Sequence, residues 1–334
     1  YTVPAPGEKG SETWSGDAWK TGGGPIWTTG TYDPELNLTY WGVGNPGPDW
    51  NGDGRPGDNL YTDSVIALDP DTGALKWHYQ FTPHDEFDYD STQIPVLAEI
   101  QWQGKPRRVI LFANRNGVFY VIDRATGQFL QATPFTKVNW VDGWDAAGRP
   151  NKVLEPTPQG TLVYPNNQGA TNWYSPSFSP RTGLFYIPTW ADTFSVYRKT
   201  PGKDSVKYTE GQQFTGTFPT MSFPALVAGA ANVRLPRDGY GSIQAVDPKT
   251  GKQQWEFKMT DVTDSGVLST ASDLVFAGGR EGYFFALDAK TGALLWRSMV
   301  GGQIASGPMT YAVNGRQYVA VSAGNNLFVW ALRR

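Results

Sequence analysis

The sequence predicts an all-β protein of the β-propeller class, and three observations support this prediction. One sequence pattern recurs along the chain, with 41 residues between its last two copies and 54 between Asp69 and Asp123. Turn-forming residues are frequent, with 39 Gly and 25 Pro among 334 residues, and 14 Trp and 17 Phe accompany them. Between the turns lie short segments rich in β-branched and aromatic residues, which is typical of strands rather than helices.

The recurring pattern has the form Ala-X-Asp-X-X-Thr-Gly-X-X-X-Trp. It occurs at Ala67–Trp77, Ala245–Trp255 and Ala286–Trp296, and Asp247 and Asp288 of the last two copies are 41 residues apart. In each copy we expect an apolar strand that ends at the aspartate, followed by a tight turn. The Asp and Thr side chains would cap backbone groups of that turn, and the glycine would supply a positive φ angle. Because the tryptophan then lies on the next strand, each copy predicts a hairpin.

Weaker copies of the pattern lie between the clean ones. Val121–Gly127 is followed by Gln131 where the tryptophan would stand, and looser relatives begin at Tyr32 and Phe178. Repeats of about 40–50 residues with about four strands each are the signature of a β-propeller. We therefore expect a single propeller domain over residues 1–334, with about five or six blades.

Composition excludes several classes of function. The 28 basic and 31 acidic residues give a formal charge of −3, so the basic excess that favours nucleic acid or an anionic membrane is missing. The chain has no Cys and two His. This excludes a Cys nucleophile, a thiolate zinc site, an Fe–S cluster and covalently attached c-type haem. No run of about 18 apolar residues could span a bilayer.

Five further segments carry a more specific signal than the repeat. They are Trp19–Trp27, Gly42–Pro46, Arg55–Asn59, Thr82–Asp90 and Asn114–Gly117. In this order, and together with the repeat, they resemble the quinoprotein alcohol dehydrogenases, a family that uses pyrroloquinoline quinone (PQQ) in an eight-bladed propeller. The resemblance implies PQQ- and metal-dependent oxidation of a primary alcohol to an aldehyde, with electrons passed to a cytochrome c in the periplasm.

The resemblance covers what would be the last five or six blades of the family's propeller. The chain begins at Tyr1, without a Met or a signal-like segment, and we expect the opening blades of the family to be missing. In the family those blades carry a glutamate metal ligand, several cofactor contacts and a disulfide between adjacent cysteines. Their absence would explain the lack of Cys, and an N-terminal propeller segment or other subunits are expected as partners.

Four residues are expected to contact the quinone. Trp27 follows a run of three glycines, where backbone can approach a ligand closely and the indole offers a flat apolar platform. By resemblance it is the floor on which the PQQ ring stacks. Arg115 would donate to the ortho-quinone oxygen, where negative charge grows during the reaction. Asn172 aligns with a further ring contact, and Asn325 is expected at a PQQ carboxylate.

Three residues are expected to bind a metal ion. Asn45 offers a hard, neutral oxygen. Asp88 and Asp90 belong to a group of four carboxylates within six positions, and in an extended segment they point to the same side. Two carboxylates that close repel each other unless a cation lies between them or one is protonated. By resemblance Asn45 is a ligand, and Asp88 is also the base that takes the hydroxyl proton of the alcohol.

Asp90 indicates which metal is bound. Calcium-dependent members of the family carry a small or neutral residue there, whereas lanthanide-dependent members carry Asp. A trivalent ion needs an additional anionic ligand to balance its charge. We therefore expect a lanthanide(III) ion held by Asn45, Asp88 and Asp90, with Ca²⁺ as the alternative.

The residues also leave non-enzymatic interpretations open. Taken alone, Trp27 could pack between blades, Asn45 and Arg115 could belong to turns, and the acidic segment could be a solvated loop. The chain could then be a non-catalytic propeller scaffold or binding subunit, or a remnant of a quinoprotein in a larger assembly. A scaffold, however, has no reason to keep the metal and quinone residues together, which favours the enzyme with a small alcohol as substrate.

Two positions depart from the family pattern. Asp264 stands where many members have Trp, and Gly324–Asn326 replaces a Gly–Trp pair found in some members. A third segment, Asp49–Gly54, imitates the start of an EF-hand loop. Its twelfth position is Leu60 instead of Glu, so the segment is interpreted as a polar turn.

Overall fold

The structure is a computed structural model that describes residues 2–221 and 239–332. Apart from two short 3₁₀ turns, η1 (Ser11–Thr13) and η2 (Ala18–Thr21), the elements in these ranges are β-strands. None of the helical segments described there is long and apolar enough to cross a membrane. The predicted all-β class is therefore confirmed.

Five antiparallel sheets follow one another along the described chain. Sheet 1 contains β1 (Thr31–Asp33), β2 (Leu38–Gly42), β3 (Ser64–Leu68) and β4 (Leu75–Gln80). Sheet 2 contains β5 (Val96–Trp102), β6 (Lys105–Ala113), β7 (Val118–Asp123) and β8 (Phe129–Pro134). Sheet 3 contains β12 (Ser177–Ser179), β13 (Leu184–Ala191), β16 (Tyr240–Val246) and β17 (Gln253–Met259).

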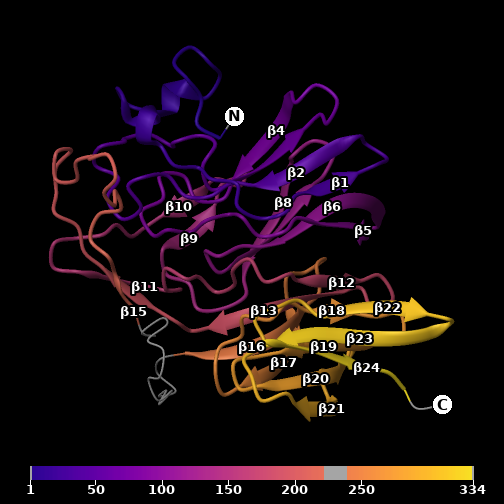
Figure 1. Cartoon of the computed structure of the whole chain (residues 1–334). Coiled ribbons are helices and arrows are strands. Elements are labelled where there is room, and N and C mark those ends of the chain that lie inside the picture. The colour runs from indigo at the N-terminus through magenta and orange to yellow at the C-terminus, as the bar shows by residue number, and fades with distance from the viewer. Residues whose placement is uncertain (1, 222–238, 333–334) are drawn as a thin grey trace.

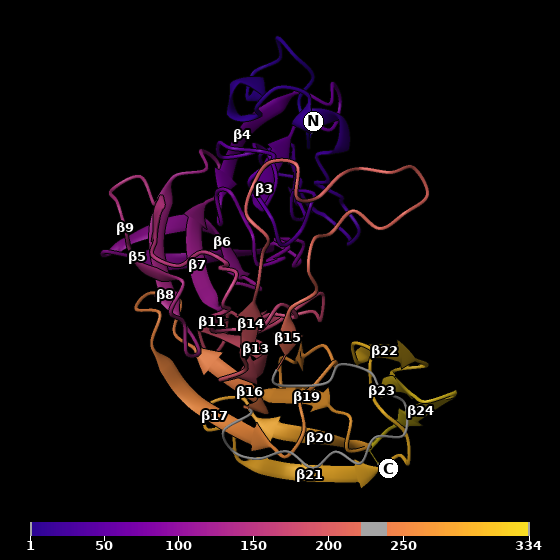
Figure 2. The same ribbon diagram turned by 90° about the vertical axis from the view of Figure 1, so that its left-hand side faces the viewer.

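The last two sheets continue this arrangement. Sheet 4 contains β18 (Leu268–Ser269), β19 (Leu274–Gly278), β20 (Tyr283–Asp288) and β21 (Leu294–Met299), and sheet 5 contains β22 (Met309–Val313), β23 (Arg316–Ala323) and β24 (Asn326–Trp330). Smaller sheets form from β9 (Val141–Trp144) with β10 (Pro150–Lys152), and from β11 (Thr161–Val163), β14 (Ser195–Tyr197) and β15 (Thr220–Met221). Sheets 1 to 5 succeed one another along an arc (Figures 1 and 2). The number of blades in a complete ring stays a prediction.

Each sheet shares a hydrophobic core with the next one. Phe112 and Tyr120 of sheet 2 are buried with Tyr79 of sheet 1, while Leu111 and Phe119, on the opposite face of sheet 2, are buried with residues of sheet 3. Two further cores join sheet 3 to sheet 4 and sheet 4 to sheet 5. Because side chains alternate between the two faces of a strand, an inner sheet needs apolar residues on both faces.

The Asp-X-X-Thr-Gly segments form the predicted turns. Asp288 Oδ1 accepts the backbone N–H groups of Lys290 and Thr291, both at 2.9 Å, and Gly292 has a φ of 72°. The tryptophan of the preceding repeat then packs on this glycine. A Cβ atom on Gly292 would lie 2.6 Å from Cε3 of Trp255. Gly127 and Trp77 have the same relation, at the same distance.

Because strand directions alternate, the connections between strands lie at two opposite ends of the molecule. In an antiparallel meander, successive connections lie at opposite ends of the sheet. The Asp-X-X-Thr-Gly turns join third and fourth strands and therefore lie at one end. The opposite end carries the connections between second and third strands and those that lead to the next sheet. We call it the site end. Long connections gather there, including residues 43–63 and residues 135–176, the second of which contains β9, β10 and β11.

The packing of tryptophan on the repeat glycine predicts a difference between two equivalent glycines. Gly73 has nearly the same φ as Gly292, 71°, but a Cβ atom on Gly73 would have no neighbour within 4 Å. Gly73→Ala should therefore cost only the strain of left-handed alanine, about 1 kcal/mol. Gly292→Ala should lose about 1–3 kcal/mol more, because the Trp255 ring must also move. Urea unfolding followed by tryptophan fluorescence measures both, and equal losses would contradict the proposed packing.

Candidate cofactor and metal site

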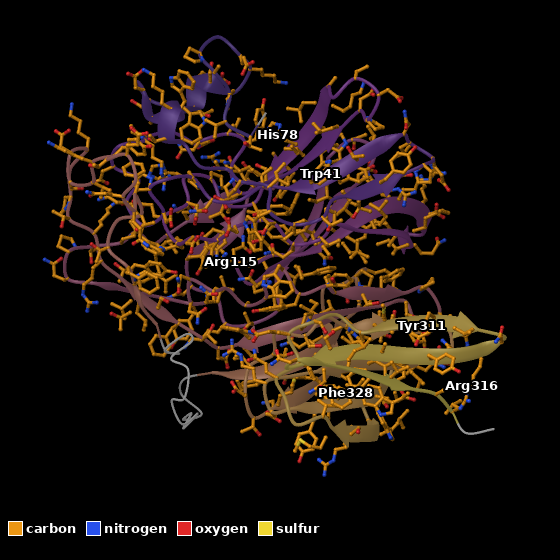
Figure 3. The ribbon with its side chains drawn as sticks, viewed as in Figure 1. Trp41, His78, Arg115, Tyr311, Arg316 and Phe328 are labelled. Carbon is orange, nitrogen blue, oxygen red and sulfur yellow. The ribbon has the colours of Figure 1, made fainter. Side chains whose placement is uncertain are left out.

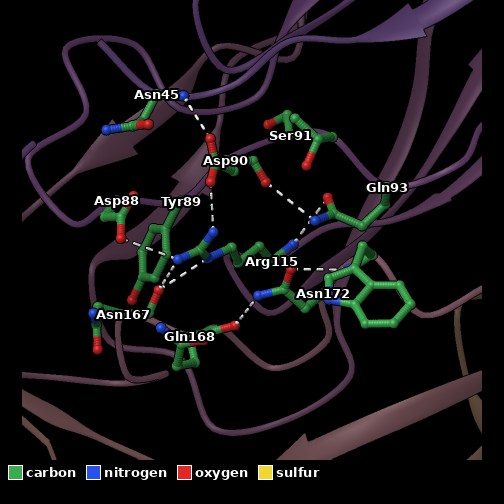
Figure 4. A network of polar contacts seen from close by, with 12 residues as sticks. Asn45, Asp88, Tyr89, Asp90, Ser91, Gln93, Arg115, Asn167, Gln168 and Asn172 are labelled. Atoms are coloured by element: carbon green, nitrogen blue, oxygen red, sulfur yellow. Dashed lines mark hydrogen bonds and ion pairs between the residues drawn. The ribbon is translucent and has the colours of Figure 1, made fainter. Parts of the chain in front are cut away.

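The predicted site residues come from separate connections at the site end. Asn45 lies between β2 and β3, Arg115 lies in the turn between β6 and β7, and Asp88 and Asp90 lie between β4 and β5. Asn172 lies in the segment that leads from sheet 2 to sheet 3. The fold brings Asn45, Asp88, Asp90 and Arg115 together in one polar network, and Asn172 lies beside it (Figure 4).

Arg115 is the centre of this network. Its Nη1 donates to Asp90 Oδ2 at 2.6 Å and its Nη2 donates to Asp88 Oδ2 at 3.0 Å, while its Nε donates to the backbone oxygen of Asn167 at 2.9 Å. Only 5% of the Arg115 side chain is exposed, and it lies near the middle of the molecule (Figure 3). Burial disfavours its charge, but Asp88 and Asp90 outweigh burial and raise the pKa of Arg115. The arginine is therefore the cation that these two carboxylates share.

Asp90 also connects Arg115 to the segment that carries Asn45. Its Oδ1 accepts the backbone N–H of Asn45 at 2.9 Å. The residue before Asn45 is Gly44, and a Cβ atom there would collide with Asp90 Oδ1 and lie 3.0 Å from Pro25. The absence of a side chain at this one position therefore lets the carboxylate lie against the backbone of the β2–β3 connection.

Asp88 has unusual backbone and electrostatic properties. Its φ is 63°, in the left-handed region that aspartate tolerates better than most residues. Burial raises the pKa of Asp88 well above its usual value; Arg115 opposes this shift and Asp90 adds to it. The carboxyl group therefore holds a proton more readily than an exposed aspartate does.

Two acids near this network were not predicted as site residues. Asp63 is fully buried, and neither of its carboxylate oxygens has a hydrogen-bond partner among the described residues. Burial, followed by Asp85 and Asp90, raises the pKa of Asp63 well above its usual value. Burial also raises the pKa of Asp49 to about 6, although a hydrogen bond from Asn45 acts in the opposite direction and lowers this pKa. No sequence motif marks Asp63, and Asp49 drew notice only as part of an incomplete EF-hand pattern.

The donor atoms of the network suit a hard cation. Within residues 2–221 and 239–332, no three His, Asp or Glu side chains are arranged as ligands around one point. The predicted ligand set contains only two acids, however, and its third member is an amide. Asn45 Oδ1 and Asp88 Oδ1 accept no hydrogen bond from the described residues, and carboxylate and amide oxygens are the ligands that Ca²⁺-like ions prefer. The residues present therefore fit a metal ion of this class.

The surroundings of Trp27 suit a planar ring. Trp27 and Trp173 are 44% and 42% exposed, and both line an open hollow of about 390 Å³ together with Thr28, Thr29, Ile94 and Ser175. Trp173 was not predicted, although it directly follows Asn172. The Asn172 side chain accepts the backbone N–H of Trp173 and donates to the backbone oxygen of Gln168, both at 2.9 Å. Two exposed indoles beside one hollow fit an aromatic cofactor.

Asn325 is the predicted site residue that lies apart from this network. It is exposed in the turn between β23 and β24, also at the site end. Among the described residues, no hydrogen bond joins it to Arg115 or to the carboxylates. Its neighbour Gly324 donates its backbone N–H to Gln303 O at 2.9 Å. A cofactor contact at Asn325 stays a prediction.

Comparisons with known proteins identify the family of the chain. The model of the PQQ family described as "Glucose/ethanol/alcohol dehydrogenase, beta-propeller domain" matches residues 1–139 and 129–319. The quinoprotein alcohol dehydrogenase PedH of Pseudomonas putida KT2440 is 38% identical over 95% of this chain and 52% of its own length. A lanthanide-dependent methanol dehydrogenase of Methylacidiphilum fumariolicum is 37% identical over 96% of this chain and 51% of its own length.

Solved structures show the same similarity. The chain superposes on a quinohemoprotein alcohol dehydrogenase from Comamonas testosteroni with a TM-score of 0.82 and 38% identity, covering 94% of this chain and 47% of that one. For a europium-containing methanol dehydrogenase, the TM-score is 0.84 and the identity 36%, covering 96% and 54%. The chain thus spans about half the length of these relatives. We conclude that it belongs to the PQQ family of glucose, ethanol and alcohol dehydrogenase β-propellers.

Proposed function

We propose that the protein containing this chain oxidises a primary alcohol to an aldehyde with PQQ and a bound metal ion. One observation supports this proposal above the others: carboxylates and an arginine from separate connections form a single buried network beside two exposed indoles. The names of the relatives, which are alcohol and methanol dehydrogenases, agree with it. Reconstitution of the apo-protein with PQQ and either La³⁺ or Ca²⁺, followed by alcohol-dependent dye reduction, tests the proposal.

The residues fall into two groups by the ligand they would hold. Asn45, Asp88 and Asp90 would bind the metal ion through hard oxygen atoms. Trp27, Arg115, Asn172 and Asn325 would hold the quinone, with the Trp27 ring against its flat face. When bound, PQQ supplies the acceptor for the two electrons that leave the alcohol.

Asp88 would act as the general base of the reaction. A carboxylate oxygen that accepts no hydrogen bond from the described residues can take up a proton, and Asp88 Oδ1 is such an oxygen. It can therefore accept the hydroxyl proton of an alcohol that lies within hydrogen-bonding distance. The Arg115 N–H group 3.0 Å from Asp88 Oδ2 fixes the orientation of this carboxyl group, and 16% of the Asp88 side chain is exposed, which leaves it accessible to a substrate.

We propose a lanthanide(III) ion as the metal, with Ca²⁺ as the alternative. The second carboxylate, Asp90, adds the negative charge that a trivalent ion needs. Two relatives are lanthanide-dependent methanol dehydrogenases by name.

We further propose that electrons pass to a cytochrome c in the periplasm and that residues 1–334 form one partial propeller domain. A non-catalytic scaffold or a quinoprotein remnant in a larger assembly is the alternative. Burying several charged groups costs free energy that a purely structural core avoids with apolar residues. The burial of Asp63, Asp88, Asp90 and Arg115 therefore favours a catalytic origin of the network.

Removal of the second carboxylate should change the choice of metal. We expect Asp90→Ala to weaken La³⁺ binding at least about tenfold and Ca²⁺ binding much less, because the trivalent ion depends more strongly on anionic ligands. Isothermal titration calorimetry with PQQ present measures both affinities. Asp17→Ala, which removes an exposed carboxylate paired with Lys20, is the control and should change neither. Equal losses for the two ions would rule out the proposed role of Asp90.

Removal of the base should slow the reaction without releasing the ligands. Asp88→Asn keeps an oxygen atom for the metal but cannot accept the proton, so kcat should fall by about 10²–10⁴-fold. Quinone content, measured by absorbance after gel filtration, should stay close to that of the unchanged protein. Full activity of this variant in the dye-linked assay would show that another group takes the proton.

A further inference from the structure

Sheet 4 contains a second arginine turn that matches the Arg115 turn in sequence position and geometry. Asn114–Gly117 joins β6 to β7, and Gly279–Gly282 joins β19 to β20; in each, the second of four residues is arginine. The last residue is glycine with a φ of 89° or 77°. Its N–H donates to the first residue of the turn, at 3.0 Å and 3.3 Å respectively. Arg280 is therefore the structural counterpart of Arg115.

An aspartate from a neighbouring connection fixes Arg280, as Asp88 and Asp90 fix Arg115. Arg280 Nε donates to Asp264 Oδ2 at 2.6 Å, and its Nη2 donates to Asp264 Oδ1 at 3.1 Å. Asp264 also accepts hydrogen bonds from the Tyr174 hydroxyl at 2.8 Å and from Gln303 Nε2 at 2.6 Å. All of these residues lie in connections at the site end. Both oxygens of Asp264 are thus fully occupied, so this carboxylate is a support and has no free position for a ligand.

The Arg280 pair lies between the two ends of the predicted quinone site. Tyr174 follows Trp173, which lines the hollow, and the two rings are 5.0 Å apart. On the other side, Gln303 accepts the backbone N–H of Gly324, which directly precedes Asn325. A continuous series of contacts therefore runs from the hollow, through Asp264, to the turn that carries Asn325.

Arg280 has more unused hydrogen-bonding capacity than Arg115. All three guanidinium nitrogens of Arg115 donate to described residues. Nη1 of Arg280 makes no hydrogen bond within the described ranges, and 17% of the side chain is exposed. The guanidinium also lies 5.1 Å from the centre of the Trp190 ring, which helps to fix its plane. A fixed guanidinium with a free N–H edge is suited to a carboxylate.

We propose that Arg280 binds a carboxylate group of the quinone cofactor and that Asp264 is the positioning residue that orients it. This inference rests on the proposed function, since it concerns the same cofactor. PQQ carries carboxylates on its ring system, and Arg115 is engaged by two aspartates. Arg280 supplies an additional donor for an anionic cofactor, and it is linked to the hollow through Asp264, Tyr174 and Trp173.

Binding of PQQ and of its neutral trimethyl ester tests the proposal. Equilibrium dialysis with LaCl₃ present, with free quinone measured by absorbance, gives the Kd of each compound for the whole protein. We expect Arg280→Gln to weaken PQQ binding roughly tenfold, the usual loss for one charge-assisted hydrogen-bond pair, and to leave ester binding unchanged. Arg280→Lys should recover only part of the loss, because lysine lacks the planar fork. Asp264→Asn should weaken PQQ binding less than Arg280→Gln does.

A matched control uses an arginine–aspartate pair at the opposite end of the molecule. Arg181 Nε lies 2.9 Å from Asp273 Oδ1 between exposed turns, so Arg181→Gln should bind both quinones as the unchanged protein does. Equal PQQ affinity of the Arg280→Gln variant and the unchanged protein would overturn this inference alone. Equal losses of PQQ and ester would also overturn it, since they would indicate a general structural effect. Failure of the unchanged protein to bind PQQ would overturn the proposed function and this inference together.

Discussion

The candidate site depends on one buried interaction, the contact of Arg115 with Asp88 and Asp90. Removing these three charges from water costs several kcal/mol per ion, so the arrangement persists only with close geometry and full hydrogen bonding. Two glycines without side chains allow the segments that carry these charged groups to approach one another closely. Gly44 leaves room for the Asp90 carboxylate, and a Cβ atom on Gly169 would lie 2.5 Å from the backbone oxygen of Arg115. The backbone of each connection that contributes to the site must therefore hold its position closely.

The architecture explains why such a site can form without disturbing the fold. Stability comes from apolar faces shared between neighbouring sheets and from tryptophans that pack on repeat glycines. Those features lie in the strands and in the Asp-X-X-Thr-Gly turns. Connections at the site end can be long and can carry charged residues, although some of their aromatic residues, such as Trp50, Phe87 and Trp140, also pack in a core. The same separation lets Arg115 and Arg280 occupy equivalent turns in two sheets while facing different partners.

The regular part of the fold was predictable from sequence because its causes are local. A turn such as Asp288–Gly292 is determined by residues within five positions, and its repetition shows that neighbouring units pack alike. The convergence of Asn45, Asp88 and Arg115 is not a local property, and it was expected only through the resemblance to quinoprotein dehydrogenases. The confirmed part is accordingly the fold class and the family, whereas the roles of these residues stay proposals.

Other features had no sequence signal from which they could be predicted. Asp63 follows no motif, and its importance comes from burial beside acids that lie more than twenty positions away. Asp264 was noticed as a departure from the family pattern, but its partner Arg280 was not, because the pairing depends on the contact of two separate connections. Trp173 lines the hollow, but no motif distinguishes it from the other tryptophans of the chain. The roles of such residues depend on contacts between positions that are far apart in the sequence. The sequence alone does not reveal these contacts.

The serial arrangement of the cores has a consequence for durability. Sheet 5 borders only sheet 4 among the described parts of the chain, so thermal fraying or mechanical pulling at that sheet can begin without opening the contacts of Arg115. Sheet 2, in contrast, is held on both faces, and it carries the arginine turn. Packing on both faces should therefore make sheet 2, and with it the turn that carries Arg115, less prone to fraying than sheet 5.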